Sequence, residues 1–399
     1  MKASAGKPKV LMLAFGHPDN VLSLCKAVSW HVHVELVFVV AEDRFRQGIL
    51  DIDITSMPYG LNSYDSSKQF LPAEISEFIG SSFNIRFLRT PSRKLLGKSG
   101  CINLKIVQSA AISLKKEKHQ AVHYNGASGF IGLFRLILRG GIKNIWTIHD
   151  YIPHRGEANP KGDFVQRITM LLGFEYIQHY QWLRERFIEH YRINSRKVHQ
   201  VYSGAFNIFN HFDAKKNAEI QDHVLFFGRI SPYKGIDTLL KAYLKLKKEY
   251  PQLAVKLCIA GSGSIWFDDS LLKHPDIMFI NRYIQTNELV YLIKSCRYIV
   301  LPYTDSTHSA VVMTAYAFNK PVVAANVGGL HEVVLHGKTG FLCERDRVDE
   351  LSAAMYPLMA DDGLLVEMSD NIERFKNEGV ISWEKVATRM SILYQSYNG

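Results

Sequence analysis

The chain has 399 residues, of which 47% are hydrophobic and 22% are charged. This length exceeds what one hydrophobic core usually supports, so we expect two domains in a soluble globular protein. No segment is long and apolar enough to span a bilayer, and the apolar run from Lys9 to Phe15 is too short for the core of a signal peptide. We therefore expect a cytoplasmic protein.

The formal net charge of +10 is concentrated in the first half of the chain. Residues 1–212 carry 27 Lys and Arg against 16 Asp and Glu, whereas residues 213–399 carry 21 against 22. This asymmetry predicts an acidic partner for the first half, either nucleic acid or an anionic membrane surface, with a solvated basic face as the alternative. The candidate membrane-binding residues mix basic and apolar side chains: Arg86, Phe87, Leu88, Arg89, Arg93, Lys94, Leu95, Leu96 and Lys98.

The five cysteines are scattered along the chain without any Cys-x-x-Cys pair. Most of them lie in apolar runs. This spacing predicts reduced core thiols rather than a disulfide framework or a zinc site.

Apolar, β-branched runs alternate with helical patterns through the first half. The predicted strands are 10–15, 34–40, 85–88, 121–124 and 145–149, and the helical patterns include 104–114 and 129–138. Such alternation is typical of βαβ units that build a parallel sheet.

The segment 207–221 loses this periodicity and is interpreted as a linker, after which the alternation restarts. The predicted strands of the second half are 224–227, 255–260, 277–281, 298–301 and 321–325, and the last predicted helices are 348–359 and 383–397. We therefore predict an α/β protein with two doubly wound, Rossmann-like domains. A ligand would bind in the cleft between the carboxyl ends of their sheets.

The stretch from Tyr303 to Glu332 contains the most informative pattern. A buried strand that ends at Tyr303 is followed by a polar loop, a helix-prone run from Ala310, and a second buried strand. The helix N-terminus would offer free backbone N–H groups and its dipole, so we expect a phosphate there. By contrast, Gly261-Ser262-Gly263-Ser264 lacks the third glycine of a dinucleotide fingerprint, and a tight strand-to-helix turn is its expected role.

Four motifs follow one another in the second half: FFGRISPYKG at 226–235, KPVV at 320–323, VGGLHEVV at 327–334 and GKTGF at 337–341. In order and spacing they resemble family 4 of the retaining glycosyltransferases, which have the GT-B fold. The first half matches only loosely, at 148–150, 153–157 and 197–204. The resemblance implies an acceptor-binding domain at 1–206, a nucleotide-sugar-binding domain at 207–380, and a final helix at 381–399 that could pack back on the first domain.

The resemblance also implies roles for individual residues. Arg229 and Lys234 would pair with the donor diphosphate, whose negative charge grows as the glycosidic bond breaks. His149 would line the pocket near the transferred sugar, although a histidine that ends an apolar strand is often purely structural. The other implied donor-binding residues are Gly228, Tyr283, Ile284, Asp305, Ser306, Ser309, Ala310, Val311, Thr314 and Glu332. The implied acceptor-binding residues are His17, His154 and Arg155.

One departure from the family pattern concerns two glutamates that are usually separated by seven residues. Their places are taken by Ser306 and Thr314. In the family, the second glutamate binds the ribose hydroxyls and the first lies beside the donor sugar, so donor recognition is expected to differ here. Asp305 could supply a carboxylate, Thr314 one weaker hydrogen bond, and the helix amides would still bind the phosphates.

The resemblance implies a retaining glycosyltransferase that moves a sugar from a nucleotide diphosphate sugar to a glycan or lipid-linked acceptor in bacterial surface polysaccharide biosynthesis. The alternatives are a nucleotide-sugar epimerase or sugar phosphorylase of the same fold, and a non-catalytic glycan-binding protein. The expected partners are the donor, the acceptor and the anionic inner face of the plasma membrane, without nucleic acid. We expect no cofactor and no required metal. Asp51 and Asp53 match the Asp-x-Asp of a different glycosyltransferase fold, but no other ligand cluster accompanies them.

Overall fold

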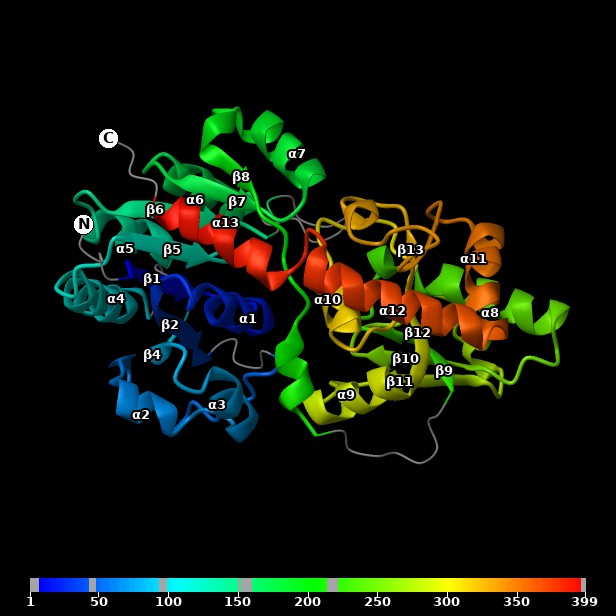
Figure 1. Ribbon diagram of the computed structural model, residues 1–399. Helices are drawn as coiled ribbons and strands as arrows, with labels where there is room; N and C mark the ends of the chain where they lie inside the picture. Colours follow the sequence, from blue (N-terminus) through cyan, green and yellow to red (C-terminus); the bar gives the residue numbers. More distant parts are fainter. Residues whose placement is uncertain are drawn as a thin grey trace.

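The computed structural model shows two α/β domains side by side, each built on one sheet (Figure 1). It describes residues 7–42, 48–92, 99–149, 151, 160–213 and 222–395. The predicted fold class, two doubly wound α/β domains, is confirmed.

The first domain contains an eight-stranded sheet with the order β3-β4-β2-β1-β5-β6-β7-β8, in which only β3 is antiparallel to its neighbour. Its strands are β1 Lys9–Ala14, β2 His33–Ala41, β3 Gly60–Leu61, β4 Asn84–Thr90, β5 Ala121–Asn125, β6 Lys143–Thr147, β7 Glu175–Gln178 and β8 Val198–Gln200. Its helices are α1 Pro18–Val28, α2 Tyr64–Lys68, α3 Ala73–Ile79, α4 Gly100–Lys115, α5 Phe130–Ile137, α6 Pro160–Met170 and α7 Gln181–Tyr191. Central strands such as β1 and β5 are buried along almost their whole length, which explains their continuous apolar sequences.

The second domain contains a six-stranded parallel sheet with the order β11-β10-β9-β12-β13-β14. Its strands are β9 His223–Phe227, β10 Lys256–Gly261, β11 Ile277–Asn281, β12 Cys296–Leu301, β13 Val322–Ala325 and β14 Gly340–Cys343. The helices of this half are α8 Ile236–Glu249, α9 Thr286–Ser295, α10 Ala310–Ala317, α11 Val348–Ala360, α12 Asp362–Glu378 and α13 Trp383–Gln395. Short 3-10 helices are η2 Ser195–Lys197, η3 Asn207–His211, η4 Pro232–Lys234, η5 Asp269–Lys273 and η6 Leu330–Glu332.

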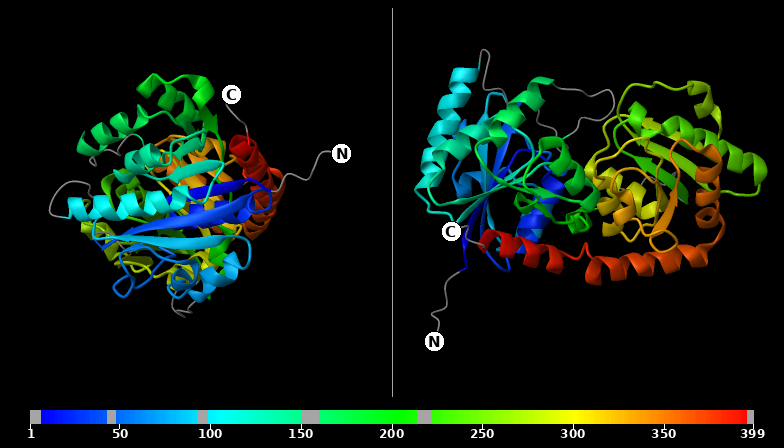
Figure 2. Two further views of the ribbon diagram at one scale, coloured as in Figure 1. Left: turned by 90° about the vertical axis from the view of Figure 1, so that its left-hand side faces the viewer. Right: turned by 90° about the horizontal axis from the view of Figure 1, so that it is seen from above.

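The chain crosses between the domains twice, at residues 203–213 and again before α13. Helices α12 and α13 run along one side of both domains, so the end of the chain returns to the first domain (Figure 2). There α13 packs against α1, and the Tyr394 hydroxyl lies 2.8 Å from Nδ1 of the buried His123. At the crossing, the indole of Trp383 donates a hydrogen bond to the Ala205 carbonyl at 2.7 Å. A β-carbon at Gly204 would lie 2.4 Å from that indole, so only glycine permits this contact.

Glycines also allow the carboxyl ends of β9 and β10 to approach each other. Gly228 has φ 132°, and a β-carbon at Gly261 would lie 1.7 Å from the Gly228 carbonyl oxygen. The chain then continues through a bridge between Ile230 and Gly263. These contacts fix the direction in which the segment after β9 leaves the sheet.

Three sequence-based predictions are corrected by the structure. The first part of the expected linker forms η3, in which Ile208 and Phe209 are buried between the domains, because apolar residues are interspersed among its polar ones. The expected strand-to-helix turn at 261–264 instead leads into an irregular segment that ends at η5. The strands β3, β7, β8 and β14 and the helix α12 were not predicted. The expectation about cysteines agrees with the structure, since four of the five are buried and all are free thiols.

Candidate functional site

Four histidines meet where the carboxyl ends of strands from the two sheets face each other. His17 follows β1, His149 follows β6, His179 follows β7, and His308 lies in the loop between β12 and α10. The ring centroids are 5.1 Å apart for His149 and His179, and 5.3 Å apart from each of these to His308. The His17 ring lies 4.0 Å from that of His149. Both domains therefore contribute to this cluster, which we call the histidine cluster.

His149 is held in one orientation by Asn125, at the end of β5. Its Nε2–H donates to Asn125 Oδ1 at 2.8 Å, and its Nδ1 has no hydrogen-bond partner among the described residues. Burial lowers the pKa of His149 well below its usual value, and the neighbouring histidines lower it further. The imidazole is therefore neutral at physiological pH and presents a lone pair on Nδ1.

His17 has an unusual backbone conformation. It lies in the left-handed region, with φ 53° and ψ 54°, immediately before Pro18 begins α1. A non-glycine residue in this region is uncommon, and such residues concentrate at functional sites. This conformation places the His17 ring against His149.

Arg229 and Lys234 are positioned by the turn that joins β9 to α8. The Arg229 guanidinium donates to the Tyr233 hydroxyl at 3.2 Å, and the Lys234 ammonium lies 3.7 Å from the centre of the Tyr303 ring. The Thr304 N–H donates to the Tyr233 carbonyl at 2.9 Å and so joins this turn to the loop before α10. Both cations therefore lie beside the polar loop that was predicted to bind phosphate.

Helix α10 begins at Ala310, as the sequence predicted, and Ser309 is its N-cap. The Ser309 side chain makes no capping hydrogen bond, and no acidic residue occupies the first turn of the helix. Ala310 and Val311 are only partly buried. The first amides of α10 can therefore hydrogen-bond to an anion, and the helix dipole favours one there.

The Gly328-Gly329 turn closes tightly over the same loop. A β-carbon at Gly328, where φ is 57°, would lie 1.9 Å from the Ser306 carbonyl oxygen, and one at Gly329 would lie 2.1 Å from the Tyr180 ring. Tyr180 belongs to the first domain. The two glycines therefore hold the loop in place and let the domains touch.

Glu332, which was predicted to bind the donor, makes its hydrogen bonds across the domain interface. Its carboxylate accepts hydrogen bonds from the Gln181 N–H at 2.9 Å, the Trp182 N–H at 2.8 Å and the Tyr202 hydroxyl at 2.9 Å. Because Gln181 and Trp182 open α7, Glu332 caps a helix of the other domain. We therefore assign Glu332 to the domain interface rather than to donor binding.

The two residues in place of the family glutamates are both buried. Ser306 is 2% exposed and Thr314 is 3% exposed. The Thr314 hydroxyl donates to the Ala310 carbonyl one turn earlier, at 3.0 Å. Thr314 can accept a hydrogen bond from a ligand but has no second proton to donate, which weakens its predicted contact with a nucleoside. Asp305 is partly buried at the start of the same loop.

The remaining predicted site residues follow β11 or lie outside the described residues. Tyr283, which is 37% exposed, and Ile284 follow β11, beside the ion pair between Arg282 and Glu288. His154 and Arg155 lie outside the described residues. Asp53 is exposed and accepts hydrogen bonds from the N–H and hydroxyl of Thr55, as in a local turn.

The predicted membrane-binding residues on β4 are buried, so the prediction that they form a membrane-binding surface is wrong. Arg86 pairs with Glu35 and Glu117, and Arg89 pairs with Glu42. Phe87 and Leu88 belong to the core, and residues 93–98 lie outside the described part of the chain. The sequence suggested an exposed basic surface because the carboxylates that pair with these buried arginines are distant in the sequence.

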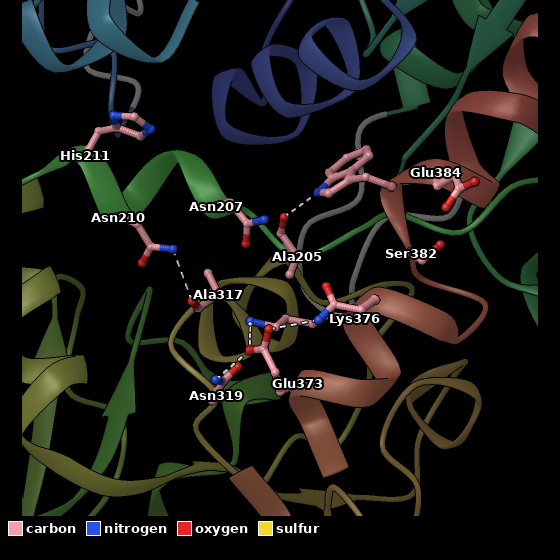
Figure 3. Close-up of a pocket in the computed structure, with 12 residues that line it drawn as sticks. Ala205, Asn207, Asn210, His211, Ala317, Asn319, Glu373, Lys376, Ser382 and Glu384 are labelled. Carbon is pink, nitrogen blue, oxygen red and sulfur yellow. Dashed lines mark hydrogen bonds and ion pairs between the residues drawn. The ribbon is translucent and has the colours of Figure 1, made fainter. Parts of the chain in front are cut away.

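A hollow of about 710 Å³ lies at the crossing between the domains, lined by η3, α12 and the start of α13 (Figure 3). Its polar groups bond mainly to one another: Glu373 accepts from Asn319, Lys376 and Asn377. These donors lower the pKa of Glu373 to about 2, with Lys376 contributing most. Because Glu373 already pairs within the hollow, we assign the hollow to the crossing between the domains rather than to a ligand site.

Comparisons with known proteins match part of the chain to glycosyltransferases. Residues 221–361 match the family model described as glycosyl transferases group 1. A Haemophilus influenzae protein described as an uncharacterized glycosyltransferase is 34% identical over 150 residues, which cover 37% of this chain and 42% of that protein. The D-inositol 3-phosphate glycosyltransferase of Corynebacterium efficiens is 31% identical over 180 residues, which cover 43% of this chain and 42% of that protein. The chain thus spans less than half the length of these relatives, and the matches support a transferase enzyme.

Solved structures match almost the whole chain. Sucrose-phosphate synthase from Thermosynechococcus elongatus superposes with a TM-score of 0.65 at 16% sequence identity. The superposition covers 97% of this chain and 98% of the synthase chain. The chain has the GT-B fold. A second GT-B neighbour, Anabaena Alr3699/HepE in complex with UDP and glucose, gives a TM-score of 0.63 at 15% sequence identity. The superposition covers 96% of this chain and 99% of the neighbour's chain. At these identities the likeness concerns the fold alone.

Sequence reasoning missed several residues of this site, namely Asn125, His179, Tyr233, Tyr303 and His308. His179 ends a strand that was not predicted, and His308 was seen only as part of a polar loop. The available signal was that polar side chains directly after parallel strands meet at one edge of a sheet. The structure also describes no helix long and apolar enough to cross a membrane, within the part of the chain it covers.

Proposed function

We propose that this GT-B protein transfers a sugar from a nucleotide diphosphate sugar, with retention of anomeric configuration, to a glycan or lipid-linked acceptor of bacterial surface polysaccharide. The observation that carries this proposal is the convergence of Arg229, Lys234 and the amides of α10 at one edge of the second sheet. Two fixed cations and an uncapped helix N-terminus suit a diphosphate. The family 4 resemblance and the UDP bound to the Anabaena neighbour support the same choice.

In this proposal the leaving diphosphate gains negative charge as the glycosidic bond breaks, and Arg229 and Lys234 stabilise that charge. Their neighbours Tyr233 and Tyr303 hold both cations in place before the reaction, so little reorganisation is needed. His149 faces the same region from the first domain and can accept a hydrogen bond from a sugar hydroxyl through Nδ1. The transfer itself requires no metal, because the protein's own cations neutralise the diphosphate.

The test is product analysis with donor alone and with donor plus acceptor, in which released nucleoside diphosphate is measured and the new anomeric centre is assigned by NMR. A transferase releases nucleoside diphosphate much faster with acceptor present and keeps the donor's anomeric configuration. An epimerase would convert the donor without acceptor, and a phosphorylase would require inorganic phosphate. A glycan-binding protein would release no nucleoside diphosphate under either condition.

We further propose that the first domain docks on an anionic membrane through α6 and Leu171, which directly follows it. Four large apolar side chains of this surface are exposed, with Leu171 at 85% and Phe164 at 65%. They are Phe164, Val165, Ile168 and Leu171. The exposed cations Lys161 and Arg167 accompany them, within a half-chain that has an excess of basic residues. Apolar and basic side chains on one helix suit the interface of an anionic bilayer.

This docking surface is tested by co-sedimentation with vesicles of neutral and anionic lipid. Binding should rise with anionic lipid and fall with salt, and Phe164→Ser with Leu171→Ser should abolish it. Val366→Ser on α12, where the side chain is 62% exposed, is the matched control and should bind like the parent. Equal binding to neutral and anionic vesicles would reject the electrostatic part, and unchanged binding of the double variant would reject the surface.

A further inference from the structure

The ring centres of His149, His179 and His308 are spaced as those of three histidines that bind one metal ion. In a tetrahedral zinc site each nitrogen lies about 2.1 Å from the metal, each ring centre about 3.2 Å from it, and two ring centres therefore about 5.2 Å apart. The observed separations are 5.1, 5.3 and 5.3 Å. One ligand nitrogen from each ring lies within 4.8 Å of the other two, so the three nitrogens could reach one ion between them after the side chains adjust.

Hydrogen bonds to the other ring nitrogens fix two of these histidines in the tautomer that a metal requires. Asn125 Oδ1 accepts from Nε2–H of His149 at 2.8 Å, which leaves the lone pair on Nδ1. The Val201 carbonyl lies 3.0 Å from Nδ1 of His179 and can only accept, so His179 carries its lone pair on Nε2. Metal-binding histidines usually donate their second N–H to such an oxygen, which orients the ring and raises its basicity.

Burial gives a second, independent reason to expect a ligand here. His149 is 3% exposed and His179 is 7% exposed. Nδ1 of His149 is a buried polar atom without a hydrogen-bond partner among the described residues, and such an atom is costly unless a ligand satisfies it. His308 is partly exposed, so the cluster is not fully enclosed.

A second group of possible metal ligands consists of Glu35, Glu117 and His119, and its ligand atoms already have partners. Its carboxylates already pair with Arg86 and Lys9. These two cations neutralise the group, so it is an ion-pair network rather than a place for a metal.

We propose that His149, His179 and His308 bind one divalent transition-metal ion of the Zn²⁺ class, with the fourth coordination position open to water or to a ligand oxygen. Three neutral imidazoles suit Zn²⁺ and its spectroscopic substitute Co²⁺ better than Mg²⁺ or Ca²⁺, which prefer oxygen ligands. Because His308 comes from the second domain and the other two ligands from the first, the bound ion would tie the domains together. The ion and a sugar hydroxyl would compete for Nδ1 of His149, and binding of the ion can be measured without any sugar.

The test uses the full chain without a polyhistidine tag, freed of metal with a chelator and titrated with Co²⁺ while the visible absorption of tetrahedral Co²⁺ is recorded. The parent should bind one equivalent, and Zn²⁺ should displace it. His308→Ala should weaken Co²⁺ binding by about 100-fold or more, and Asn125→Ala, which removes only the supporting hydrogen bond, by about 10-fold to 100-fold. His33→Ala removes an exposed histidine on β2 and should bind like the parent.

His308 lies in a loop and is partly exposed, so its substitution should leave the fold intact, and circular dichroism checks this. Zn²⁺ should raise the melting temperature of the parent and of His33→Ala, but not that of His308→Ala. The proposal is overturned if the parent shows no saturable Co²⁺ binding at micromolar concentrations. It is equally overturned if the folded His308→Ala variant binds Co²⁺ as tightly as the parent.

Discussion

Glu332 connects the two domains, and its removal should destabilise the protein without weakening nucleotide binding. The carboxylate receives the first two N–H groups of α7 and the Tyr202 hydroxyl, and Tyr180, the N-cap residue, offers no side-chain cap of its own. Loss of a helix cap costs about 1 kcal/mol, and loss of a hydrogen bond from Tyr202 to a charged group about 1.5 kcal/mol more. Because Glu332 is partly exposed, we expect Glu332→Ala to lower the free energy of unfolding by about 2 kcal/mol in total.

The assay is urea unfolding of Glu332→Ala and Glu332→Gln, beside calorimetric titration of a nucleoside diphosphate into the same proteins. Gln keeps one acceptor oxygen but loses the charge, so it should fall between Ala and the parent. Glu367→Ala on α12 removes an exposed carboxylate and serves as the control, with a stability change within about 0.5 kcal/mol. If Glu332→Ala is as stable as the parent, or if it loses nucleotide affinity while remaining folded, the assignment of Glu332 to the domain interface is wrong.

Three further predictions concern the donor site and the response to pH. Arg229→Ala and Lys234→Ala should each slow turnover roughly a hundredfold, on the order of 3 kcal/mol in barrier, with unchanged circular dichroism; near-parent rates in both would refute their role. Ala310→Glu should abolish nucleoside diphosphate binding by placing a carboxylate in the phosphate position, whereas Gly363→Glu in the first turn of α12 should not; calorimetry decides between these outcomes. Burial lowers the pKa of His123 to about 3, so the unfolded chain takes up a proton below about pH 6.5 that the folded chain does not. The contribution of His123 to stability should therefore fall as the pH drops below 6.5, with a slope that approaches about 1.4 kcal/mol per pH unit near pH 5, and His123→Gln should remove this part of the profile.

The long buried strands could be predicted from the sequence because strands that are covered on both faces form continuous apolar runs. The predicted strand Ile277–Asn281 coincides with β11, and the predicted start of α10 at Ala310 is correct. The short strands β7 and β8 were missed because polar side chains interrupt them. Glu175 on β7, for example, pairs with Lys143 and with His199 on β8, partners that only the folded sheet brings together.

The donor side of the site could be predicted because its residues lie in compact motifs. Arg229 and Lys234 share one turn, and the loop before α10 is continuous in the sequence. His17 and His149 were predicted as site residues, but their grouping with His179 and His308 could not be predicted, since the four residues come from both domains and are up to 291 positions apart, between His17 and His308. The wrong prediction of a membrane-binding surface on β4 has the same origin, because the carboxylates that pair with Arg86 and Arg89 lie elsewhere in the sequence.

The central claim is that the second domain binds the diphosphate of a nucleotide sugar through Arg229, Lys234 and the N-terminus of α10. Isothermal titration of a panel of nucleoside diphosphates into the parent and into the Arg229→Ala, Lys234→Ala double variant tests it most directly. We expect at least one nucleoside diphosphate to bind the parent saturably, and the same ligand to bind the folded double variant at least about 100-fold more weakly, because two charge-assisted contacts are lost. Equal affinity for both proteins, or no binding of any nucleoside diphosphate to the parent, would contradict the claim.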